Sequence, residues 1–159
     1  MDFNQNTVQS PAKTLKTLTI IHLALLAGMV LFAGVVYSIT PNPVLNFKDT
    51  DEHFLILVPF MAITGIAASV FVSKQQIAKA KEGETLNAKI AGYLSASIIK
   101  FALLEGPALF GIVGFLLTTN LLYLLISIVI MLYFLSQRPV KQNVIDQLGL
   151  SYEEGMELG

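Results

Sequence analysis

Four long runs of apolar residues, separated by short polar segments, dominate the pattern of this chain. Each run holds about 20 residues or more, which is enough for a helix to cross a hydrocarbon layer of roughly 30 Å. The pattern predicts an all-α membrane protein with four transmembrane helices, arranged as two tandem hairpins. We expect these helices to cover residues 14–39, 54–73, 86–117 and 121–137.

Local breakers indicate where the helices end. Pro41 follows the first run, Gly83 lies in a charged connection, and Pro139 follows the last run, and both residue types interrupt a helix. The third run continues without a break, so its first turns are expected to project beyond the lipid. Only a short turn, 118–120, separates it from the fourth run, so the third and fourth helices should pack as a hairpin.

The two ends of the chain are polar. Residues 1–13 form the expected N-terminal tail, 14–137 the transmembrane domain, and 138–159 a cytoplasmic C-terminal tail. Within the C-terminal tail, Val144, Ile145 and Leu148 fall on one face of a short amphipathic helix. That spacing leaves open a frayed tail or a helix that docks on a partner.

Basic residues predict the orientation, because they are enriched in cytoplasmic loops. Eight of them share the side that holds both termini and the middle loop, against Lys48 on the other side: Lys13, Lys16, Lys74, Lys79, Lys81, Lys89, Arg138 and Lys141. We therefore expect a multi-pass protein of the bacterial inner (cytoplasmic) membrane with both termini in the cytoplasm.

Composition agrees with a lipid environment and excludes several functions. Apolar residues make up 54% of the 159 residues and charged residues 13%, where a soluble domain carries about 25% charge. The net charge of -1 gives no concentrated basic face for nucleic acid. The sequence has no cysteine, phosphate-binding loop, nucleophile elbow or metal-ligand cluster. We expect no enzymatic activity, no cofactor and no metal site.

The first and third helices share a sequence pattern. Laying 20–35 over 98–113 gives nine identities in sixteen positions, which favours a parallel repeat of two hairpins over bias in composition. Within it, Ala24 and Gly28 match Ala102 and Gly106. Small residues spaced in this way let helices approach closely. We expect Ala24, Gly28, Ala102 and Gly114 to lie at helix contacts.

Glu105 is the polar residue that the sequence singles out. It lies near the middle of the third apolar run and is followed by Gly106 and Pro107. A carboxylate in lipid is costly, so we expect it to be protonated, paired or turned toward a polar cavity, shielded from lipid tails. A proton-handling or partner-pairing role and a purely structural role in packing both stay open. Lys100 is expected to extend toward the cytoplasmic boundary, and His22 to face the bundle or the interface.

The stretch from Ala102 to Val113, with Glu105, Phe110 and Gly111, resembles the ion-binding helix of rotor-ring proteolipids (c subunits) of rotary ATPases. In that family a membrane carboxylate is followed by an aromatic-glycine pair. The resemblance covers about a dozen residues and implies Glu105 as a proton or sodium site, framed by Phe110 and Gly111. In this chain, however, the carboxylate lies in the first helix of its hairpin and the polar loop is rich in lysine.

Three hypotheses of function follow. The first is a non-enzymatic subunit of a larger bacterial membrane complex, with other membrane subunits as partners. The second is a homo-oligomeric proton-binding or ion-binding proteolipid that works through Glu105. The third is a small transporter, which the shortage of polar groups in the apolar runs disfavours.

Overall fold

The computed structural model describes residues 10–47 and 52–158, all of them in helices, turns and short connections. The polar residues 1–9 and the segment 48–51, with Lys48 and Asp49, lie outside the described residues. The helices are α1 Pro11–Ile39, α2 Glu52–Lys81, α3 Leu86–Thr118, α4 Leu121–Ser136, α5 Lys141–Leu148 and α6 Tyr152–Met156. The all-α class predicted from the apolar runs is confirmed.

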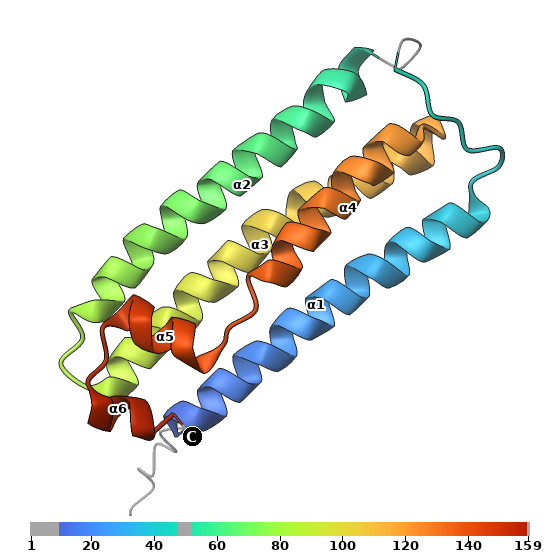
Figure 1. Ribbon diagram of the computed structural model, residues 1–159. Helices are drawn as coiled ribbons and strands as arrows, with labels where there is room; N and C mark the ends of the chain where they lie inside the picture. The colour runs from blue at the N-terminus through green and yellow to red at the C-terminus, as the bar shows by residue number, and fades with distance from the viewer. Residues whose placement is uncertain (1–9, 48–51, 159) are drawn as a thin grey trace, which may run out of the picture.

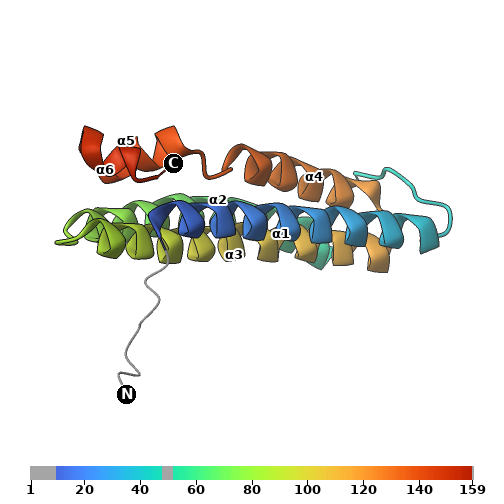
Figure 2. The ribbon, with the colours of Figure 1, turned by 90° about the horizontal axis from the view of Figure 1, so that it is seen from below.

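The long helices form a layer with α3 in the middle. α3 packs along α2, α4 and α1, whereas α1 and α2 make almost no contact with each other. Figure 1 shows α1 and α2 on opposite sides of α3, and Figure 2 shows α4, α5 and α6 together on one face of this layer. Among the described residues, no helix covers the opposite face of α3 (Figure 2).

This packing corrects the prediction of two equivalent hairpins. In a repeat, α1 would pack on α2 as closely as α3 packs on α4, but only the second pair is in extensive contact. The nine shared positions therefore do not correspond to equivalent surroundings: α3 is the central helix and α1 a peripheral one. The physical reason is that shape complementarity between faces, and not composition, selects the neighbour of a helix in an apolar bundle.

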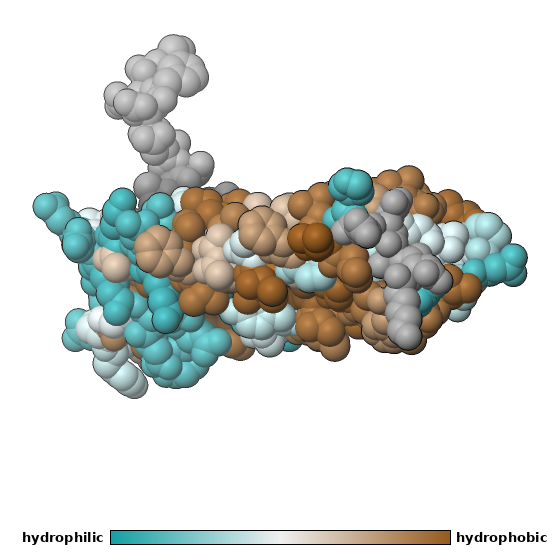
Figure 3. All heavy atoms as spheres, turned by 90° about the horizontal axis from the view of Figure 1, so that it is seen from above, coloured by the Kyte–Doolittle hydropathy of each residue, from teal (hydrophilic) through white to brown (hydrophobic). Residues whose placement is uncertain are grey.

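Three helices are long and apolar enough to cross a membrane by themselves: α1, α2 and α3. α4 has 16 residues, and it passes the same test only when joined to α5 across a bend of 77°. The described residues therefore contain three to four helices that could cross a membrane, where four were expected. Hydrophilic residues gather at the end that carries α5 and α6, while the surface along the long helices is mostly hydrophobic (Figure 3).

α2 is longer than predicted. The lysine-rich segment expected as a connection continues the helix to Lys81, because no glycine or proline occurs between Ser73 and Gly83. Lys79 and Lys81 occupy its last turn, where cations interact favourably with the helix dipole. Lys74 and Lys81 are thereby held on a rigid helix.

Asn120 links the turn between α3 and α4 to the loop after α1, at the end of the bundle remote from α5. It caps α4 by accepting a hydrogen bond from the Leu122 N–H, and its amide donates to the Asn46 carbonyl at 2.7 Å. The Val44 carbonyl accepts a further bond from the Leu121 N–H at 2.8 Å. The short turn was predicted, and these bonds add that it anchors the loop between α1 and α2.

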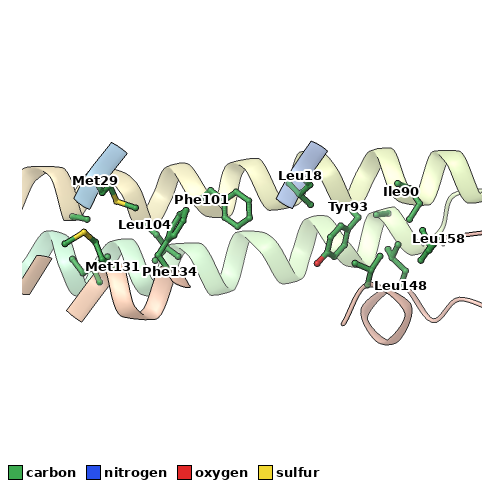
Figure 4. Packing of buried hydrophobic residues seen from close by; sticks show 14 of the residues in the cluster. Leu18, Met29, Ile90, Tyr93, Phe101, Leu104, Met131, Phe134, Leu148 and Leu158 are labelled. Atoms are coloured by element: carbon green, nitrogen blue, oxygen red, sulfur yellow. The ribbon is translucent and has the colours of Figure 1, made fainter. Parts of the chain in front are cut away.

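The C-terminal segment is neither frayed nor free to dock on a partner, the two outcomes that the sequence left open. Val144 and Leu148 of α5 are buried with Leu158 against Ile90 and Tyr93 of α3 (Figure 4). The first turns of α3 project beyond α4, and the segment after α4 folds back to cover them (Figure 1). Without α5, the apolar side of that projection would be exposed. The apolar face of α5 therefore packs on α3 within the same chain.

Candidate functional site

Glu105 is half-buried on α3 and has no hydrogen bond or ion pair to any residue that the structure describes. It lies four residues after Phe101, whose ring contacts His22 of α1 with centroids 5.0 Å apart. Four residues turn a helix by about 40° beyond one full turn, so Glu105 sits at the edge of the contact between α1 and α3. The partner expected for this carboxylate is not supplied within the described chain.

The residues predicted to frame Glu105 pack elsewhere. Pro107 lies against Gly65 of α2, and Gly111 packs on α4, where an added Cβ would stand 3.0 Å from the Tyr123 carbonyl oxygen. Phe110 stacks near Phe54 of α2, with ring centroids 6.2 Å apart. Since these side chains point to α2 and α4, the frame implied by the proteolipid resemblance does not assemble around the carboxylate.

Small residues near Glu105 line an open surface. Ala102 and Gly106 are exposed, and a Cβ added at Gly106 would meet nothing within 4 Å. With Thr64 and Gly65 of α2 they border a shallow depression of about 350 Å³. No helix within the described residues therefore makes the expected close approach at Gly106.

The other residues predicted to lie at helix contacts are either exposed or buried against a neighbouring helix. Ala24 and Gly28 of α1 are exposed, and a Cβ at Gly28 would also meet nothing within 4 Å. Gly114 is buried, and a Cβ there would stand 3.3 Å from Val58 Cγ2 of α2. Gly114 thus lies at a helix contact as predicted, while Ala24, Gly28 and Ala102 are exposed among the helices that the structure describes.

His22 is fully buried between α1, α3 and α4. Its ring stacks on Phe134, with centroids 4.6 Å apart and planes 5° apart, and Nε2 lies 2.9 Å from the Phe134 carbonyl oxygen. A carbonyl only accepts, so Nε2 is the donor, and the bond satisfies a carbonyl in the last turn of α4. Nδ1 has no hydrogen-bond partner. His22 therefore faces the bundle, and no group of three or more potential metal ligands forms among the described residues.

Lys100 reaches the end of α4, where its Nζ donates a hydrogen bond to Gln137 Oε1. A small polar cavity beside this pair is bordered by Ser73, Tyr93 and Ser97, with side chains from α5 closing it. Lys100 extends toward polar groups as expected, but its surroundings were not predicted. The polar surroundings of Lys100 could have been predicted from Lys74 and Lys81, which lie on one face of α2.

Comparisons with known proteins give no relative: no family model matches the chain, and no curated protein or solved structure matches it.

Proposed function

We propose that this protein is a non-enzymatic subunit of a larger bacterial membrane complex, in which a neighbouring subunit covers the face of α3 that carries Glu105. The observation that supports this most directly is the half-buried carboxylate without a partner among the described residues. A carboxyl group in an apolar helix is stabilised by pairing, hydrogen bonding or access to water. A second subunit is the simplest source of that stabilisation.

The open small-residue surface supports the same proposal. Gly28, Ala102 and Gly106 leave room for another helix to approach the backbone, and such close approach drives helix association in lipid. Many large apolar side chains of α1 and α2 are also exposed, among them Leu31, Ile56 and Phe71. Lipid or partner helices are needed to cover them.

The proposed topology has four crossings with both termini in the cytoplasm of a bacterial cell. α4 begins beside the loop after α1 and returns to the level of Lys100, since Gln137 follows its last turn and bonds the Lys100 ammonium. Its 16 residues span about 24 Å, which a slightly thinned or tilted bilayer accommodates. The basic residues then gather on the cytoplasmic side.

This topology changes the proposed depth of Glu105. If Lys100 and Gln137 mark the polar boundary, residues 101–118 of α3 cross about 27 Å, which is close to the hydrocarbon thickness. Glu105 is five residues from Lys100, or about 7.5 Å inside the boundary. It would then lie in the cytoplasmic third of the layer, where a partner's polar side chain can reach it.

The experiment is co-purification from membranes in mild detergent, followed by native mass spectrometry. We expect a stoichiometric set of other proteins, with Glu105→Leu releasing them and Glu105→Gln, which keeps a hydrogen-bonding head group, retaining them. Thermal stability of the isolated chain should be unchanged in both variants, because Glu105 has no bond within the described chain. Ser38→Leu is the matched control, since Ser38 is exposed and bonds only its own helix.

Two results would count against the subunit proposal. A monomer without partners would overturn it, and so would full retention of partners by Glu105→Leu. A ring of identical chains would instead support the proteolipid alternative, and in that case Glu105→Gln should keep the ring while abolishing ion binding.

A further inference from the structure

A second cavity, separate from the Glu105 surface, opens between α2, the middle of α3 and the end of α4. Its volume is about 490 Å³, and residues of α2, α3, α4 and α5 border it. Three lysines line it, Lys74, Lys81 and Lys100, together with the amides of Gln137 and Gln147. The smaller polar cavity described above adjoins it through Ser73, Lys100 and Gln137, which line both.

The charge in this cavity is positive and uncompensated. Lys74 and Lys81 are seven residues apart on α2, which is nearly two full turns, so both lie on the same face. Lys100 enters from α3 and is held by a neutral amide, Gln137. Among the described residues, no carboxylate lines either cavity, and none of the three lysines has an ion pair.

The cavity also lies where the apolar surface of the bundle ends. Lys74 directly follows the apolar part of α2, and Ser136 ends α4 at the same level as Lys100. Val70 and Tyr133 line the side of the cavity toward the apolar surface, and tyrosine is typical of the membrane interface. Beyond them, Phe71 and Leu132 are exposed.

We propose that this cavity binds the phosphate group of an anionic phospholipid. The lysines and the amides would hold the headgroup, and the acyl chains would run along the exposed apolar surfaces of α2 and α4. Basic pockets between transmembrane helices on the cytoplasmic side suit such headgroups, because a lysine side chain is long enough to place its ammonium group at the polar boundary. The proposal needs only that the chain spans a membrane, and it does not depend on the role of Glu105.

The test is lipid binding to the purified chain in detergent, measured by native mass spectrometry with phosphatidylglycerol and with phosphatidylcholine. We expect phosphatidylglycerol to bind more tightly, and Lys74→Gln and Lys81→Gln each to weaken it about fivefold. Lys79→Gln is the matched control, because Lys79 is exposed on the same helix, turned by about 140° from Lys74, and does not line the cavity. Circular dichroism checks that each variant keeps its helices.

A second arm separates a lipid from a soluble anion. Phosphatidylglycerol should raise the melting temperature of the detergent-solubilised chain, whereas inorganic phosphate should not. Equal stabilisation by inorganic phosphate would overturn the lipid assignment. Equal affinity for phosphatidylcholine, or a loss in Lys79→Gln as large as that in Lys81→Gln, would overturn the site itself.

Discussion

Gly65 of α2 and Gly28 of α1 are both glycines in apolar helices, but their surroundings differ. A Cβ added at Gly65 would run into the ring of Pro107 and stand 2.8 Å from the Leu103 carbonyl oxygen, whereas one at Gly28 would meet nothing within 4 Å. Proline at 107 has no N–H for that carbonyl. At residue scale, the break in the α3 hydrogen-bond ladder thus coincides with a close approach of α2 and α3.

We expect Gly65→Ala to lower the free energy of unfolding of the isolated chain by about 1–3 kcal/mol, because the methyl group has no space between the two backbones. Gly28→Ala should be neutral or slightly stabilising, since alanine favours helix by up to about 1 kcal/mol over glycine. Denaturation in mixed detergent micelles measures both. Equal stability of the two variants would contradict the close packing at Gly65.

At the scale of elements, the unequal lengths of α3 and α4 determine what the C-terminal segment does. α3 has 33 residues and α4 has 16, so the first half of α3 projects beyond α4. α5 packs on this projection and on α2, and Val144 and Leu148 are buried there. α6 then begins with a capping box at Ser151 and Glu154, a device that satisfies the first free N–H groups of a helix.

Leu148→Ala should release α5 from α3. Leu148 is 2% exposed, and truncating a buried leucine costs about 2–5 kcal/mol. We expect faster proteolysis of the segment after Gln137, with the spanning helices intact. Met156→Ala is the control, because Met156 is 63% exposed on α6. The docking would be disproved if both variants were cut at the wild-type rate.

The α6 helix should also respond to pH. Glu154 Oε1 lies 2.7 Å from Lys89 Nζ, and this hydrogen bond, followed by the one from the Ser151 backbone, lowers the pKa of Glu154. A carboxyl whose folded pKa is lowered stabilises the fold above its ordinary value and loses that contribution as pH falls through the folded pKa. Amide protection in 151–156 should therefore be high at neutral pH and fall at or below about pH 4.

Hydrogen exchange at several pH values measures this response, with protection corrected for the intrinsic exchange rate. Lys89→Gln should show reduced protection already at neutral pH and a weaker further loss on acidification. A wild-type protection that stays constant down to about pH 3, below the ordinary carboxyl pKa, would show that the ion pair does not hold α6.

At the scale of the whole molecule, the chain is a layer of helices covered on one face. α4, α5 and α6 lie on that face, and none of the described helices covers the other face of α3 (Figure 2). α1 begins at the same end of the bundle as α5 and α6, while the described part of the loop after α1 lies at the opposite end (Figure 1). This arrangement lets topology be tested with single probes at the two ends.

Because the chain has no cysteine, single cysteines can be introduced without background. Lys79→Cys should react with a membrane-impermeant thiol reagent only after the cells are opened, and Leu45→Cys in intact cells, since both side chains are exposed. Labelling of Lys79→Cys in intact cells would reverse the proposed orientation. Labelling of both positions in intact cells would mean that α2 does not cross the membrane.

The sequence by itself determined the helical class and most helix ends. Apolar runs of sufficient length, prolines at 41 and 139, and the turn before Leu121 are local signals, and the observed ends lie within three residues of the predicted ones at both ends of α1, α3 and α4. The exception is the end of α2, where a charged segment that was expected as a connection stays helical to Lys81. Charge alone does not end a helix when no glycine or proline intervenes.

Only the tertiary structure decided which faces of the helices meet. Sequence reasoning predicted that Gly28 and Gly114 both lie at helix contacts, but Gly114 is buried against α2 while Gly28 is exposed. Sequence reasoning also placed Phe110 and Gly111 around Glu105, whereas in the structure Phe110 lies near Phe54 of α2 and Gly111 packs on α4. In an apolar helix nearly every face is hydrophobic, so periodicity carries little information about neighbours. The contacts follow instead from how the shapes of two faces fit, which depends on residues distant in the chain.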